Sequence, residues 1–358
     1  MRRFALLGLL GLAALTPAAP RDASACAPAP MAGQVVNIAD EAALIVWDAS
    51  QHIEHFIRRA TFRTSAKDFG FLVPTPTRPT LAEASDAVFA SLDNAIRPEV
   101  RVETTRGLEP TLACGFFLMR SSASRDDMQA AGVAPVRVLD EVRVAGYDAT
   151  VLEADDAAAL ARWLADHRYA TTPTLTAWLT PYVAMHWKIT AFRVASPDPN
   201  DPRPPGTSPV RLSFNTDTPF YPYREPEDQR LPTTAPRSLR VHMVAPQRMD
   251  ARLGERGVWP GAIAYASARD DMASLLSSLQ GVTVSAGWWL TSWDDRSSPR
   301  PGTDEVFFSP AASQARWLPP PVVVYRSDRV PVPLDLLGLA GVVGALVWRR
   351  ARRRRAQG

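Results

Sequence analysis

The chain has little of what most recognisable catalytic and metal-binding motifs require. Its 358 residues include only 2 cysteines, 5 histidines and 19 glycines. It contains no nucleophile elbow, no His-Glu-x-x-His zinc helix and no phosphate-cradling glycine loop. Two cysteines cannot form a zinc site alone. The sequence therefore matches none of these motif-defined classes, and we predict no cofactor, no metal and no catalytic residue, although a triad assembled from distant residues stays open.

The excess of positive over negative charge in the chain comes from its ends. Lys and Arg number 40, against 37 Asp and Glu. Nine of the arginines lie in the two terminal segments, so the region between them is slightly acidic. A nucleic-acid partner requires a basic face on the folded protein. We therefore expect no nucleic-acid partner.

The N-terminus has the three parts of a secretory signal. Arg2 and Arg3 precede an apolar stretch over residues 4–15, and Ala23-Ser24-Ala25 supplies the small residues that signal peptidase requires. We expect residues 1–25 to be a signal peptide that is cleaved before Cys26. The alternative is a lipoprotein signal, in which Cys26 is acylated.

The C-terminus predicts a membrane anchor. Val330 to Trp348 contains one charge, Asp335, and six arginines follow within residues 349–358. At about 1.5 Å per residue, this stretch just crosses a hydrocarbon core, and prolines near its start place the helical part from about Leu334. The arginines favour the cytoplasmic side. We therefore expect a transmembrane helix over 330–348, a cytoplasmic Arg-rich tail over 349–358, and a periplasmic or extracellular ectodomain.

Two other interpretations of the C-terminus stay open. The first is a buried helix of the soluble domain. The second is a C-terminal sorting signal, because Val330-Pro-Val-Pro, an apolar run and an arginine cluster are similar to signals of the exosortase type.

The two cysteines of the exported region, Cys26 and Cys114, are candidates for a disulfide. An exported compartment permits such a bond, and closing a long loop stabilises a fold by a few kcal/mol in the chain-entropy model. The alternative is that Cys114, within an apolar run, is a small buried hydrophobe.

Hydrophobic periodicity predicts the fold class. Alternating residues indicate paired strands over 44–48 and 53–62, a hairpin over 136–152 and a long strand over 282–291. Helical spacing indicates one helix from Thr80, where Thr80 and Glu83 form a capping box, and another from Asp155-Asp156. This mixture predicts an α+β fold with mostly antiparallel sheets and a few short amphipathic helices. A polar stretch over 121–129 is the best boundary, dividing the ectodomain into 26–128 and 129–325.

Several blocks of the sequence resemble a known bacterial family. They are Ala43-Leu-Ile-Val-Trp-Asp48, Glu54-His-Phe-Ile57, Asp68-Phe-Gly-Phe-Leu-Val-Pro-Thr-Pro76, Gly146-Tyr-Asp148, Leu212-Ser-Phe214 and Phe220-Tyr-Pro222. Together they are similar to the domain-of-unknown-function family 2330 over nearly the whole ectodomain. The resemblance implies a signal peptide and a C-terminal membrane segment, and it implies no known activity, substrate or catalytic residue.

Two clusters have the residue types of a metal site. On a strand, His52 and Glu54 share one face and His55 takes the other, so the three cannot converge on one ion without a bulge. We expect a two-sided strand in which Glu54 pairs with an arginine such as Arg58. Among several acidic pairs, Asp294-Asp295 is predicted to lie in a loop and is the best candidate for calcium.

The strand predicted over 282–291 carries the most specific binding hypothesis. Alternation assigns Trp288 to an apolar face and Trp289, with Trp293, to a mainly polar face. Two partly exposed tryptophans on a polar face could stack on sugar rings or partner side chains. The alternative is that another segment covers them.

We predict a membrane-anchored extracytoplasmic protein that is a binding or envelope-structural module rather than an enzyme. It contacts the membrane through its C-terminal helix, and its protein or glycan partner is unidentified. The alternative is an exported hydrolase. A pocket in which His and carboxylates converge would favour the hydrolase, whereas a shallow aromatic face would favour the binding module.

Overall fold

A computed structural model describes residues 28–30, 36–64, 69–111, 137–194, 208–230 and 237–355. The predicted signal peptide, Cys26, Cys114 and the polar stretch over 121–129 lie outside these residues. The chain divides into two compact units: Met1–Ala95 with Met128–Trp317, and Ile96–Asp127 with Leu318–Gly358. We call them the globular unit and the terminal unit.

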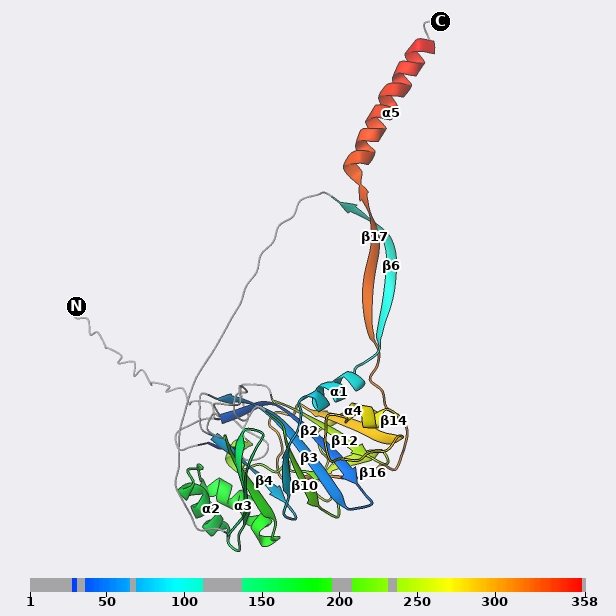
Figure 1. Ribbon diagram of the computed structural model, residues 1–358. Helices are drawn as coiled ribbons and strands as arrows, with labels where there is room; N and C mark the ends of the chain where they lie inside the picture. The colour runs from blue at the N-terminus through cyan, green and yellow to red at the C-terminus, as the bar shows by residue number, and fades with distance from the viewer. Residues whose placement is uncertain are drawn as a thin grey trace, which may run out of the picture. The chain divides into compact units, whose positions relative to one another are not determined.

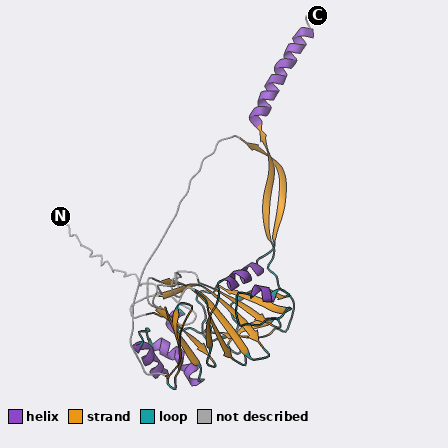
Figure 2. Ribbon diagram, in the orientation of Figure 1, coloured by secondary structure: helices purple, strands orange, loops and turns teal. Residues whose placement is uncertain are grey.

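A seven-stranded sheet forms the largest part of the globular unit (Figures 1 and 2). Its strands in spatial order are β14 (Ala262–Arg269), β15 (Trp288–Asp295), β12 (Ser238–Ala245), β2 (Val36–Asp48), β3 (Ile53–Thr64), β10 (Val210–Asn215) and β5 (Thr80–Glu83). The pair β12–β2 is parallel and the other pairs are antiparallel. The sheet joins strands from both sides of residue 128.

A five-stranded antiparallel sheet is the second layer of the globular unit. Its strands in spatial order are β1 (Pro28–Pro30), β4 (Phe69–Thr75), β9 (Lys188–Val194), β8 (Tyr147–Glu153) and β7 (Arg137–Val144). The predicted hairpin is confirmed as β7–β8. Its two turn residues, Ala145 and Gly146, have φ of 53° and 75°, as a tight hairpin turn of this kind requires.

The main hydrophobic core lies where three sheets meet. The third, smaller sheet has the order β11 (Phe220–Tyr221), β16 (Val306–Pro310) and β13 (Met249–Leu253). The core includes Ile45 and Phe56 from the seven-stranded sheet, Phe71 and Phe192 from the five-stranded sheet, and Phe308 from the third. The strand β10 shows a period-2 alternation of buried residues, whereas residues 41–47 of β2 are buried on both faces.

Two helices pack on the outer side of the five-stranded sheet (Figure 1). They are α2 (Ala157–Asp166) and α3 (Pro173–Ala184), and they form a second core with sheet residues including Leu72, Leu152 and Ala191. The predicted helix start at Asp155-Asp156 is confirmed, because Asp156 is the N-cap and accepts from the amides of the first turn.

Two further helices, α1 (Ala87–Ala95) and α4 (Met272–Leu275), lie beside the seven-stranded sheet (Figure 1). The predicted helix start at Thr80 is wrong. Residues Thr80–Glu83 form β5, because their backbone pairs with β10, and the helix begins only after Ser85 and Asp86 have accepted its first amide hydrogens. Pairing with the edge of β10 therefore determines the structure of these residues, although their spacing is that of a capping box.

The terminal unit contains a parallel pair of strands and a long helix. The strand β6 (Val100–Thr111) pairs with β17 (Val322–Pro333), and α5 (Leu334–Arg355) follows β17 directly. The helix begins at Leu334, as the prolines predicted, but residues 330–333 belong to β17 rather than to a helix. Of the helices in the described residues, none has both the length and the apolar character needed to cross a membrane.

Candidate functional site

The predicted tryptophan face is largely covered. The strand β15 begins at Trp288 and not at Val282. Alternation correctly places Trp289 and Trp293 on one face, but Trp293 is 5% exposed and its ring packs 5.4 Å from Phe308 and 6.2 Å from Trp259. The prediction that Trp293 is partly exposed is therefore wrong, because the third sheet covers this face. Trp289 and Trp288 are both half-buried.

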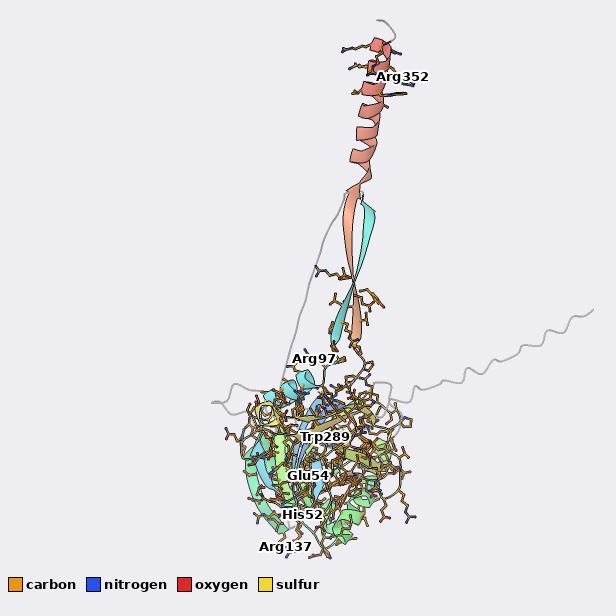
Figure 3. All side chains as sticks on the ribbon, turned by 90° about the vertical axis from the view of Figure 1, so that its right-hand side faces the viewer. His52, Glu54, Arg97, Arg137, Trp289 and Arg352 are labelled. Atoms are coloured by element: carbon orange, nitrogen blue, oxygen red, sulfur yellow. The ribbon has the colours of Figure 1, made fainter. Side chains whose placement is uncertain are left out.

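The described side chains of His52, Glu54 and His55 do not form one metal-binding cluster; Figure 3 labels His52 and Glu54 in the globular unit. His52 lies in the β2–β3 turn with φ of 54°, and its Nδ1 is 3.9 Å from the exposed Asp217. His55 Nδ1 is 2.8 Å from Ser213 Oγ on β10. Glu54 is fully buried. Within the described residues, no three His, Cys, Asp or Glu side chains are placed to hold a metal ion.

Glu54 has a different partner from the one predicted. Its Oε2 accepts a hydrogen bond from the Phe220 amide at 2.9 Å, whereas Arg58 Nε donates to Glu41 Oε1 at 2.6 Å. Burial raises the pKa of Glu54 well above its ordinary value, because a carboxylate loses its hydration in the core. Glu54 is therefore a core residue whose burial favours the protonated carboxyl, and a substrate has no access to it.

The acidic pair Asp294-Asp295 is not a loop site for calcium, because both residues end β15 and are engaged by arginine. Arg240 donates to both oxygens of Asp294, at 2.7 and 2.9 Å, and to Asp93 at 2.9 Å. These residues line a pocket of about 270 Å³ together with Arg59 and other side chains. Since Arg240 already has two carboxylate partners, this pocket is held together by its own ion pairs.

Asp295 belongs to a buried ionic network that the sequence did not predict. Tyr223 donates to Asp295 at 2.7 Å, and Arg300 lies 3.5 Å from Asp295 and 3.7 Å from Glu225. Arg237 donates to Glu225 at 2.7 Å. The charged side chains are at most 8% exposed, so each charge depends on its partners rather than on water.

One arrangement resembles a catalytic triad in composition but not in accessibility. His242 Nδ1 is 2.8 Å from Ser292 Oγ, and His242 Nε2 is 3.9 Å from Asp93 Oδ1. Burial lowers the pKa of His242 to about 4, which keeps the imidazole neutral. However, Ser292 and His242 are both 0% exposed. A substrate cannot reach the hydroxyl, so this group is a core hydrogen bond.

A second pocket is open, polar and independent of those ion pairs. It has a volume of about 340 Å³ and lies between the five-stranded sheet and the C-terminal end of α2. We call it the Trp163 pocket; it is lined by Glu141, Val142, Arg143, Asp148, Ala149, Thr150, Trp163, His167, Tyr169 and Arg193. Pockets for small molecules have volumes of about 300–1,000 Å³.

Sheet register places the charged side chains of the Trp163 pocket in one row. Arg143 on β7 pairs with Asp148 on β8, which pairs with Arg193 on β9. Directly paired residues point to the same face of a sheet. The row therefore reads positive, negative, positive across three neighbouring strands, on the face that α2 covers.

Helix α2 supplies the aromatic side of the Trp163 pocket. Trp163 and His167 are four residues apart, so they lie one above the other on the helix, and their rings stack with centroids 3.6 Å apart. His167 Nδ1 donates to the Trp163 carbonyl at 2.7 Å. That bond makes Nδ1 the donor and leaves Nε2 as the nitrogen that faces other groups.

Tyr169 closes the Trp163 pocket next to the helix end. A Cβ at Gly70 would collide with the Tyr169 ring and with the Phe192 carbonyl, so the ring lies directly on a position where only glycine fits. Burial raises the pKa of Tyr169 above its ordinary value. The phenol therefore keeps its proton at neutral pH and remains a hydrogen-bond donor.

The sequence contained part of the signal for this pocket. The sequence predicts the helix that carries Trp163 and the β7–β8 hairpin, but only as elements of the fold. Nothing in the local pattern shows that α2 returns over Arg143 and Asp148. The pocket, and not a tryptophan face, is where histidine and carboxylates converge.

Comparison with protein families gives one extended match. A family model described as an uncharacterized protein conserved in bacteria (DUF2330) matches residues 20–306. A search of curated proteins found no match. Among solved structures, the crystal structure of baculovirus P35 is similar with a TM-score of 0.32 and 9% sequence identity, over 80% of this chain and 97% of that one. That similarity is too low to support an inference about fold or function.

Proposed function

We propose that this chain, which belongs to the DUF2330 family of uncharacterized proteins conserved in bacteria, is a membrane-anchored extracytoplasmic protein whose globular unit binds a small polar molecule. The observation that carries the binding function is the Trp163 pocket. Its size suits a small ligand, and its wall combines ordered aromatic rings with charged side chains. Binding sites for small molecules combine apolar area with precisely placed polar groups, and the Trp163 pocket has mainly polar and charged side chains around one large aromatic ring.

The location rests on the two ends of the sequence. Residues 1–25 have the pattern of a signal peptide. The apolar stretch up to Trp348 precedes six arginines, which is the charge asymmetry of a segment whose C-terminal side faces the cytoplasm. In this proposal the segment 330–348 holds the protein at the cell membrane. A disulfide between Cys26 and Cys114 would stabilise the exported region.

Deleting Leu334–Gly358 should release the protein from the membrane, because the deletion removes the whole of α5 and its arginines. Fractionation of cells that express the full-length and shortened chains measures this. In spheroplasts with the full-length protein, added protease should digest the globular unit. Persistent membrane association of the shortened chain, or complete protection from protease, would contradict the proposed location.

Small molecules extracted from the cell envelope should change the indole N–H resonance of Trp163 in the full-length protein, because this residue lines the pocket. The internal control is Trp178 on α3, whose indole N–H donates to the Arg224 carbonyl at 2.9 Å. Isotope-labelled tryptophan, with W163F and W178F for assignment, resolves the two signals. If no fraction of the extract shifts Trp163 selectively, the binding function is rejected.

The second candidate function is an exported hydrolase that acts in the same pocket. The specific observation is His167, whose Nδ1–H is fixed on a carbonyl while Nε2 is available to accept a proton from a water molecule. In that case the wild-type protein converts the compound that shifts Trp163, and H167Q binds it without conversion. If the mass of the compound is unchanged after incubation with the wild-type protein, the hydrolase is rejected and the binding module remains.

A further inference from the structure

The side chain of Arg193 has unused hydrogen-bond donors in the Trp163 pocket. Its guanidinium is 31% exposed, and its one ionic contact among the described residues is with Asp148 at 3.7 Å. That separation is longer than a hydrogen bond. A guanidinium carries five N–H donors in a planar fork that matches a carboxylate. Arg193 is therefore placed and oriented by the sheet, with donors left over for a ligand.

The position of Asp148 indicates which charge a ligand of the pocket should carry. It lies in register between Arg143 and Arg193, so one carboxylate stands between two guanidinium groups. With the protonated Tyr169 phenol and the Thr150 hydroxyl nearby, the wall of the pocket is rich in donors. The ligand that complements these groups carries a carboxylate.

The acceptors of the pocket define the rest of the ligand. Asp148, Glu141 and the Nε2 atom of His167 all accept hydrogen bonds. A ligand that consisted of a carboxylate alone would offer no donors to these acceptors, and it would be repelled by the negative charges of Asp148 and Glu141. A ligand that also has hydroxyl groups satisfies them, and the volume of about 340 Å³ accommodates one of roughly the size of a sugar.

We propose that the Trp163 pocket binds a small hydroxylated carboxylic acid, of the sugar-acid type, through its carboxylate on Arg193 and its hydroxyl groups on Asp148 and Glu141. This inference rests on the proposed binding function and specifies the ligand class for the same site.

The test compares two probes that differ at one carbon. D-glucuronate and D-glucose have the same ring, but the first has a carboxylate where the second has a hydroxymethyl group. Titrated into the full-length protein, D-glucuronate should shift the Trp163 indole resonance saturably and at least about tenfold more tightly than D-glucose, since a hydrogen bond to a charged group contributes about 1.5–3 kcal/mol. The Trp178 resonance should stay in place.

Two variants show whether Arg193 is the carboxylate ligand. R193M should reduce the affinity for D-glucuronate to that for D-glucose and leave the D-glucose affinity unchanged. The matched control is R162M, because Arg162 is 71% exposed on α2 and does not line the pocket. It should bind both probes as the wild-type protein does. The Trp178 resonance shows whether R193M is folded. If R193M is unfolded, R193K is used in its place.

Each contrary result has a distinct meaning. Equal affinity for the two probes, or full D-glucuronate affinity in R193M, overturns the assignment of a carboxylate to Arg193. If neither probe shifts Trp163 while the envelope extract does, the ligand class is wrong and the binding function stands. If the extract also has no effect, the binding function itself is rejected.

Discussion

Replacing Arg300 with methionine should lower the free energy of unfolding by about 3–5 kcal/mol, the usual cost of removing one partner of a buried ion pair. The side chain is 1% exposed and lies between Glu225 and Asp295. Methionine fills much of the volume but supplies no charge. Asp295 then keeps only neutral donors, which are the Tyr223 hydroxyl and the amide and hydroxyl of Ser297, and Glu225 keeps only Arg237. Urea denaturation followed by tryptophan fluorescence measures the change.

The matched control for R300M is R296M. Arg296 is 76% exposed and 3.5 Å from Asp294, and exposed pairs contribute about 0–1 kcal/mol. The two substitutions are the same in chemistry and close in sequence, so their difference isolates burial. Losses of equal, small size would show that the network of Asp295 and Glu225 does not depend on Arg300.

Replacing Trp293 with alanine should cost about 3–5 kcal/mol, as for other large-to-small changes in a core. Its ring lies between Trp259 and Phe308 in the core where three sheets meet. A lower urea midpoint with an unchanged m-value would show that the substitution changes stability alone.

The neighbouring Trp289 provides the comparison. It lies on the same face of β15 but near the start of the strand, where it is half-buried. W289A should cost less than about 2 kcal/mol, because less of the ring is removed from a packed environment. Equal losses in W289A and W293A would mean that both rings are core, and would remove the last support for a ligand-stacking role of Trp289.

The elements that were predicted correctly are those whose signal is local. The β7–β8 hairpin has spaced valines in the strand before Ala145-Gly146, and α2 has a strong N-cap in Asp156 followed by Leu160 and Trp163 at helical spacing. In each case the residues that make the pattern also make the contacts, so neighbouring positions contain the information.

The errors occurred where a distant segment decides the outcome. Thr80–Glu83 has a capping-box pattern, but β10 arrives from residues 210–215 and pairs with it. Trp293 has polar neighbours on its strand, but the third sheet covers that face. Glu54 is near Arg58 in sequence, yet Arg58 is engaged by Glu41. The candidate site was missed for the same reason, because Arg193 joins Asp148 only through sheet register.

The parallel pairing of β2 with β12 has a consequence for how the chain acquires its structure. The hairpin β2–β3 can form as soon as residue 64 is available, but Asp40 finds its partner only when Ser238 arrives. Until then both edges of an apolar hairpin are open, and open edges of this kind recruit other strands. Contacts between such distant residues also slow folding. A nascent chain thus exposes both edges of the β2–β3 hairpin from the synthesis of residue 64 to that of β12, and we expect the yield of folded protein to depend on protection of that hairpin during this interval.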